Sequence, residues 1–121
     1  MAKPPPPPLD LEDVPGAPPR GTVLCRVSDL ADGEAKTFVY REDTFRFEMF
    51  AQRWGDAVFV YRNSCPHARL PLNMQPDRFL DLEGRHLFCA NHGAFFRVQD
   101  GYCIKGPCKG DYLRPILIEQ V

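Results

Sequence analysis

Residues 65–92 read CPHARLPLNMQPDRFLDLEGRHLFCANH, and the two ends of this stretch decide how the chain is interpreted. The first end is the cluster CPH at 65–67, and the second is the cluster CANH at 89–92. Each cluster supplies one thiol and one imidazole, which are the side chains that bind zinc and iron–sulfur centres. The pattern therefore predicts a metal centre with two cysteines and two histidines.

Both clusters begin where a predicted strand ends. The apolar segment 57–61 leads into the first cluster, and residues 87–88 lead into the second. Loops that are carried on hairpins can converge in space while their tips stay near solvent. We therefore expect the two clusters to form one site at the surface of a β-structure.

Composition limits the partners of this chain. Its 121 residues with 44% hydrophobic content fit one domain with a modest core, and the formal net charge is −1. A chain with this charge balance has no excess of positive charge that would indicate binding to nucleic acid or to an anionic membrane. The apolar runs have the length of strands, so no membrane anchor is expected, and the N-terminus lacks the features of a secretory signal. We expect a cytoplasmic protein whose oligomeric state is unknown.

Five cysteines are better explained as ligands and free thiols than as a disulfide framework. Outside the clusters, Cys103 and Cys108 form a C-x₄-C unit that could be a redox-active disulfide or a second metal site. Two buried thiols are the favoured interpretation, because buried cysteine behaves as a small apolar residue. Cys25 is expected to fill apolar space.

The N-terminal residues 1–20 contain most of the 13 prolines, including the unbroken run 4–8. Such a segment favours extended polyproline II and has little to bury. We predict a disordered proline-rich tail over 1–20 and a folded domain over 21–121.

The remaining sequence shows short strands joined by turns and no helix-length amphipathic period. Asp100-Gly101 is a strong hairpin signal, and a second turn is expected at 81–85. The strands are expected at residues 22–27, 45–51, 57–61, 87–88, 94–98, 102–104 and 113–118. The predicted fold class is all-β.

Residues 22–121 resemble the Rieske-type 2Fe-2S ferredoxins. The resemblance rests on CPH at 65–67, on CANHG at 89–93, and on Gly106-Pro107, which matches the family's proline loop. It implies a Rieske-like antiparallel β-sandwich with a small cluster-binding subdomain, and one 2Fe-2S cluster. It also implies that Cys65 and Cys89 bind one iron while His67 and His92 bind the other.

A structural zinc site is the main alternative for the same four residues. Zinc also takes two cysteines and two histidines. Common zinc spacings, however, pair cysteine with cysteine and histidine with histidine, whereas each cluster of this chain mixes the two. The iron–sulfur interpretation is therefore favoured.

Several positions depart from the family pattern. Many relatives have glycine where this chain has Arg69, and respiratory relatives have a disulfide where Leu70 and Ala90 stand. Those relatives also use serine and tyrosine, in place of Ala94 and Phe96, to donate hydrogen bonds to the cluster sulfurs. Because such bonds stabilise the reduced cluster, their absence predicts a low potential within about −150 to +300 mV.

The resemblance implies an electron-transfer protein that carries one electron between a redox protein donor and an acceptor. We expect it to serve an oxygenase or reductase system. It is not expected to be an enzyme itself, because only His86 remains for a mononuclear iron site that would need two histidines and a carboxylate. The alternative is a redox-sensing or regulatory binding module that uses the cluster.

Overall fold

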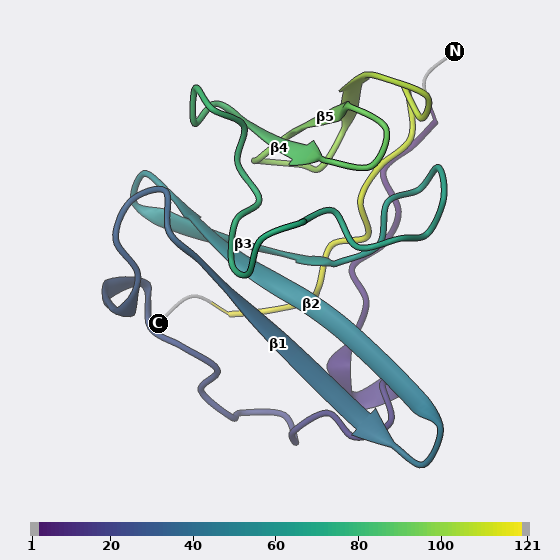
Figure 1. Cartoon of the computed structure of the whole chain (residues 1–121). Coiled ribbons are helices and arrows are strands. Elements are labelled where there is room, and N and C mark those ends of the chain that lie inside the picture. The colour runs from purple at the N-terminus through teal and green to yellow at the C-terminus, as the bar shows by residue number, and fades with distance from the viewer. Residues whose placement is uncertain (1–2, 120–121) are drawn as a thin grey trace.

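The computed structural model describes residues 3–119 and contains two three-stranded antiparallel sheets, which confirms the all-β fold class. The base sheet has the order β1-β2-β3, and the upper sheet has the order β4-β5-β6 (Figure 1). The strands are β1 (Ala35–Glu42), β2 (Phe45–Trp54), β3 (Ala57–Arg62), β4 (His86–Cys89), β5 (Ala94–Arg97) and β6 (Cys103–Lys105). The described helices are two short 3₁₀ turns, Leu11–Asp13 and Val27–Asp29.

Tight turns join the strands of the base sheet. Glu42 pairs with Phe45 across the first turn, where Asp43 has a positive φ of 52°. Trp54 pairs with Ala57 across the second turn, which begins at a glycine with φ of 68°. Successive side chains of β2 point to opposite faces of the base sheet. The adjacent residues Met49 and Phe50 are both completely buried, so both faces of this sheet are covered.

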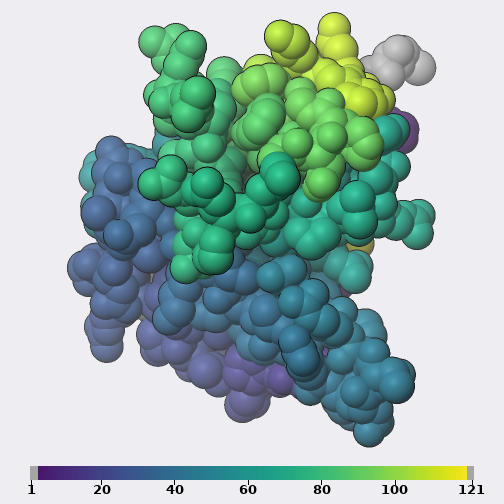
Figure 2. All heavy atoms as spheres, viewed as in Figure 1, coloured from purple at the N-terminus to yellow at the C-terminus, as the bar shows by residue number. Residues whose placement is uncertain are grey.

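The upper sheet packs on one face of the base sheet. Phe50 of β2 stacks on Phe79 with ring centroids 4.0 Å apart, and the Tyr61 hydroxyl donates a 2.6 Å hydrogen bond to the Val98 carbonyl. Figure 2 shows the green and yellow residues of the upper sheet on one side of the blue residues of the base sheet. One continuous core thus joins the two sheets.

The opposite face of the base sheet is covered by the two ends of the described chain. Met49 and Val60 of the sheet pack in one cluster with Val14 and Ile116. The Leu9 amide donates to the Pro115 carbonyl at 2.8 Å, so the two end segments run together along the sheet (Figure 1). The boundary between a tail at 1–20 and a domain at 21–121 stays a prediction.

Two of the strand predictions are wrong and one strand was missed. Residues 22–27 form no strand, because their apolar side chains pack on the base sheet while the backbone stays unpaired and ends in a 3₁₀ turn. Residues 113–118 form only isolated bridges, since Pro115 has no N–H to continue a ladder. Strand β1 was missed, because its mixture of charged and apolar residues, AKTFVYRE, gives no clean alternation.

No helix within residues 3–119 is long and apolar enough to cross a bilayer.

Candidate metal centre

The four predicted ligands differ in how deeply their side chains are buried. Cys65 and Cys89 are completely buried, whereas His67 and His92 are exposed with ring centroids 4.6 Å apart in an edge-on contact. The sequence joins each cysteine to a histidine, but the fold pairs cysteine with cysteine and histidine with histidine. Within residues 3–119, no three His, Cys, Asp or Glu side chains gather around a single ion position. The site is thus two pairs of side chains at different depths.

The two loops that carry these residues close in the same way. The Arg69 amide donates to the Cys65 carbonyl at 2.6 Å, and the Gly93 amide donates to the Cys89 carbonyl at 3.0 Å. In each loop the donor lies four residues after the cysteine, and it has a positive φ, 57° at Arg69 and 72° at Gly93. The first loop therefore adopts a turn that favours glycine, although an arginine occupies the position.

The surroundings of the Cys65 sulfur suit a metal-bound thiolate. Burial raises the pKa of the Cys65 thiol, and the adjacent Cys89 thiol raises it further. Backbone N–H groups of His67 and Ala68 act in the opposite sense, because they donate toward the sulfur and lower that pKa. Donors aimed at a ligand sulfur stabilise the thiolate that a metal requires. The residues present therefore fit a metal centre with sulfur ligands.

Hydrogen bonds hold the first loop to the second. The Ala90 amide donates to the Leu72 carbonyl at 3.0 Å, and the Asn91 side chain donates to the Pro71 carbonyl at 2.8 Å. Buried Asn63, at the end of β3, accepts from the Leu72 amide at 2.8 Å. These bonds join the two loops in a chain that has no disulfide between them.

Asn63 and Asn91 are the site residues that sequence reasoning missed. Asn91 lies inside the CANH cluster, and that position was a usable signal. Asn63 belongs to no sequence motif. Its hydrogen bond with the Leu72 amide depends on how the end of β3 lies against the first loop, which only the structure shows.

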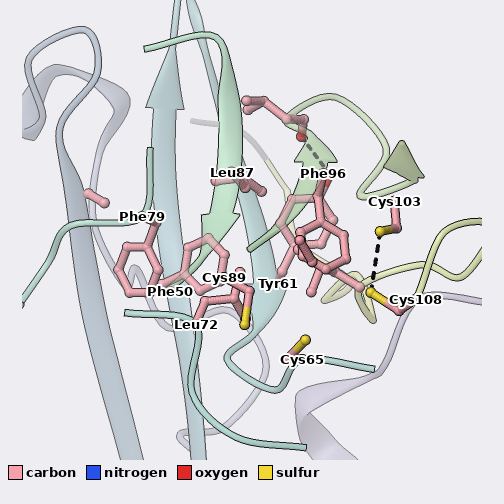
Figure 3. Close-up of a cluster of buried hydrophobic side chains, with 14 residues drawn as sticks. Phe50, Tyr61, Cys65, Leu72, Phe79, Leu87, Cys89, Phe96, Cys103 and Cys108 are labelled. Atoms are coloured by element: carbon pink, nitrogen blue, oxygen red, sulfur yellow. Dashed lines mark hydrogen bonds between the residues drawn. The ribbon is translucent and has the colours of Figure 1, made fainter. Parts of the chain in front are cut away.

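The segment at Gly106-Pro107 borders the site from a third direction. Gly106 has a φ of 109°, and a Cβ atom at this position would lie 2.7 Å from the Ala94 Cα. Only glycine allows this close approach to the second loop. Cys108 follows Pro107 and is buried. Burial and the Cys103 thiol raise the Cys108 pKa, with a smaller contribution from the nearby Cys65 thiol. Figure 3 shows the sulfurs of Cys89, Cys65, Cys108 and Cys103 in sequence across the site.

The other residues singled out by the sequence lie outside the four-residue set. His86 is in β4, where its Nδ1 is 3.5 Å from an Asp81 carboxylate oxygen. Cys25 is half-buried and packs with the cluster on the far face of the base sheet. Ala94 and Phe96 are completely buried, and neither side chain can donate a hydrogen bond.

The fold and the site define an all-β protein with the cysteine and histidine loops of an iron–sulfur domain. The family model described as "Rieske [2Fe-2S] domain" matches residues 21–117, and the chain belongs to this family. Membership implies one Rieske-type 2Fe-2S cluster.

Solved structures that are similar to this chain include a ferredoxin. It is the ferredoxin of carbazole 1,9a-dioxygenase from Nocardioides aromaticivorans IC177, with 25% sequence identity and a TM-score of 0.53. The match covers 75% of this chain and 80% of the ferredoxin. The comparison with curated proteins gave no match.

Proposed function

We propose that this protein is a one-electron carrier whose cluster is held by Cys65 and Cys89 on one iron and by His67 and His92 on the other. The observation that carries the proposal is the separation of the four side chains by depth, with a buried cysteine pair and an exposed histidine pair. A zinc ion would draw four ligands around one point, whereas these residues supply two different pairs.

Each pair has a distinct task in such a carrier. When bound, the cluster supplies reversible one-electron redox chemistry. The buried cysteines hold their side of the site in the apolar core, where Leu72 and Phe96 exclude water. The exposed imidazoles form the part of the site that a redox partner can reach, so we infer that partner proteins dock over the histidines.

The system served is inferred from similarity. The structural relative is the ferredoxin of a dioxygenase, which supports a role as the electron-transfer component of an oxygenase system; a reductase system is the second possibility. The chain has three histidines in all, so after two are used a second iron site of the oxygenase type has only His86 left. We therefore propose that catalysis resides in a partner and that this protein delivers electrons.

The ligand assignment can be tested with variants and electron paramagnetic resonance. Substitution of Cys65 or Cys89 by serine, or of His67 or His92 by alanine, should remove most of the bound iron and sulfide. His86→Ala is the matched control, because this histidine lies in β4, the strand that ends at Cys89, without belonging to the pair. The reduced wild type should give a Rieske spectrum, with a lower average g than an all-cysteine cluster. A protein that contains zinc and gives no paramagnetic resonance signal would contradict the assignment. Loss of the cluster in His86→Ala alone would contradict it as well.

The potential is a separate test. We expect a midpoint near the low end of about −150 to +300 mV, because the side chains of Ala94 and Phe96 donate no hydrogen bond to sulfur. Ala94→Ser adds a donor with little change in volume and should raise the midpoint, and Ala94→Cys, with a much weaker donor, is the size-matched control. A clearly positive wild-type midpoint in a redox titration would refute the low-potential assignment.

A further inference from the structure

Outside the four ligands, two cysteines form a close pair. Cys103 lies in β6 and is completely buried, and Cys108 lies in the following loop with 4% of its surface exposed. The Cys108 thiol donates a hydrogen bond to the Cys103 sulfur at 3.2 Å, drawn as the dashed line in Figure 3. No role in the proposed electron carrier uses this pair.

The backbone holds these two sulfurs together. The Cys103 amide donates to the Asp111 carbonyl at 2.8 Å, and the Gly110 amide donates to the Cys103 carbonyl at 3.0 Å. The loop between them is closed by the Lys109 amide, which donates to the Gly106 carbonyl at 3.1 Å. A disulfide needs a sulfur separation of about 2.05 Å, so the two sulfurs must approach each other from their 3.2 Å hydrogen-bond distance.

The pair is reached from the loop side. Cys108 lies between the exposed residues Pro107 and Lys109, whereas Cys103 has no exposed surface. An oxidant therefore meets Cys108 first. Lys105 and Lys109 are both exposed and flank this thiol in the sequence, which gives local positive charge for a small anionic oxidant.

We propose that Cys103 and Cys108 are a redox-active dithiol that low-molecular-weight anionic disulfides of the glutathione type convert to an intramolecular disulfide. The Cys108 sulfur attacks the small disulfide and releases one thiol, which leaves a mixed disulfide. The Cys103 sulfur then attacks Cys108 and releases the second thiol. The pair loses two electrons and two protons, and one small disulfide becomes two thiols, so the step balances.

The reaction should be slow. Cys103 has no exposed surface and Cys108 has only 4%, so a small disulfide reaches the pair only when the loop opens locally. We therefore expect closure over hours in the folded protein, and opening again when reduced glutathione is in excess.

Closure would tie β6 to the loop that borders the metal centre. Gly106, inside that loop, contacts Ala94, and Cys108 contacts Cys65. The bond uses no proposed ligand, so the inference does not depend on the electron-carrier proposal. It places a two-electron thiol switch beside the predicted one-electron site.

The test uses the cluster-loaded protein in anaerobic mixtures of oxidised and reduced glutathione. Samples are quenched in acid, alkylated and digested with trypsin, while iron content is measured in parallel. Lys105 separates the two cysteines, so cleavage there yields peptides 98–105 and 106–109. These peptides should remain joined in oxidising mixtures and separate after reduction. Before alkylation, the mass of the intact protein should be lower by two hydrogen atoms in the oxidised sample, with the iron content unchanged.

Matched variants complete the experiment. Cys25→Ser removes a lone thiol elsewhere and should leave the joined peptides unchanged, whereas Cys108→Ser should abolish them. If Cys108→Ser fails to fold, the wild-type peptide pattern alone decides. Two separately alkylated peptides at every glutathione ratio would overturn the proposal, and so would a bond from Cys108 to Cys65. A purified protein that holds no iron–sulfur cluster but still forms the joined peptides would count against the electron-carrier proposal only.

Discussion

Arg69 holds a backbone conformation that costs an ordinary residue energy. Its φ is 57°, and the equivalent position of the second loop is Gly93 with φ of 72°. The left-handed region costs a non-glycine residue roughly 1–2 kcal/mol. The hydrogen bond from its amide to Cys65 fixes this conformation, so the first loop keeps its turn at the expense of strain.

Replacing Arg69 with glycine should therefore stabilise the protein. We expect Arg69→Gly to exceed Arg69→Ala by about 1 kcal/mol in unfolding free energy, since both remove the charge and only one relieves the strain. Gly93→Ala should be destabilising for the same reason. The difference in stability is measured by thermal unfolding, followed by the fluorescence of Trp54, the single tryptophan. The variants are compared at equal iron content. Equal midpoints for the glycine and alanine variants would mean that the turn relaxes without strain.

At the scale of the elements, hydrogen bonds unite the two ligand loops. Asn91 donates to the Pro71 carbonyl at 2.8 Å, and the Ala90 amide donates to the Leu72 carbonyl at 3.0 Å. Respiratory relatives use a disulfide between these loops, but this chain has Leu70 and Ala90 at those positions. The loops of this protein therefore depend on weaker and individually replaceable contacts.

Removal of the Asn91 side chain should loosen the site. Asn91→Ala loses one hydrogen bond, worth about 1 kcal/mol, and should accelerate cluster loss in the presence of a chelator. Gln99→Ala is the control, because this exposed amide lies in a turn away from the loops. Bleaching of the visible absorption gives the rate of cluster loss. If both variants bleach at the wild-type rate, the connection between the two ligand loops does not depend on the Asn91 side chain.

The success of the strand predictions followed the strength of local signals. Residues 45–51, 57–61 and 94–98 combine alternation or apolar runs with turn residues, and the structure has strands there. The strand at 22–27 failed because tertiary packing, rather than pairing, used its apolar side chains. Packing between segments that are far apart in the chain leaves no pattern in the local sequence, so it could not be predicted.

The same distinction applies to the site. The spacing of the CPH and CANH clusters was enough to predict two converging loops and four candidate ligands. The depth of each pair depends on where the loops meet the core, and the contribution of Asn63 depends on the register between β3 and the first loop. Neither quantity can be deduced from residue types, because both arise from packing between segments far apart in the chain.

At the scale of the molecule, Tyr61 connects the base sheet to the upper sheet. It lies in β3, is almost completely buried, and donates to the Val98 carbonyl at 2.6 Å. Burial raises the pKa of the Tyr61 hydroxyl, with a smaller contribution from Asp100, so the group stays a neutral donor. Tyr61 thus supplies a buried polar contact that, beside the apolar packing, fixes the upper sheet and the metal centre relative to the base sheet.

Tyr61→Phe should weaken the attachment of the two sheets. The substitution keeps the ring but leaves the buried Val98 carbonyl without its partner, a loss of about 1–2 kcal/mol in unfolding free energy. Tyr40→Phe is the matched control, because the buried Tyr40 hydroxyl makes no hydrogen bond to any described residue, and its removal should be neutral or slightly stabilising. Thermal unfolding of both variants should show a midpoint lower by several degrees for Tyr61→Phe only. Because the hydroxyl joins the two sheets, amide hydrogen exchange should also accelerate in β4 and β5 more than in β1. A uniform change across all strands, or equal midpoints for the two variants, would show that apolar packing alone holds the sheets together.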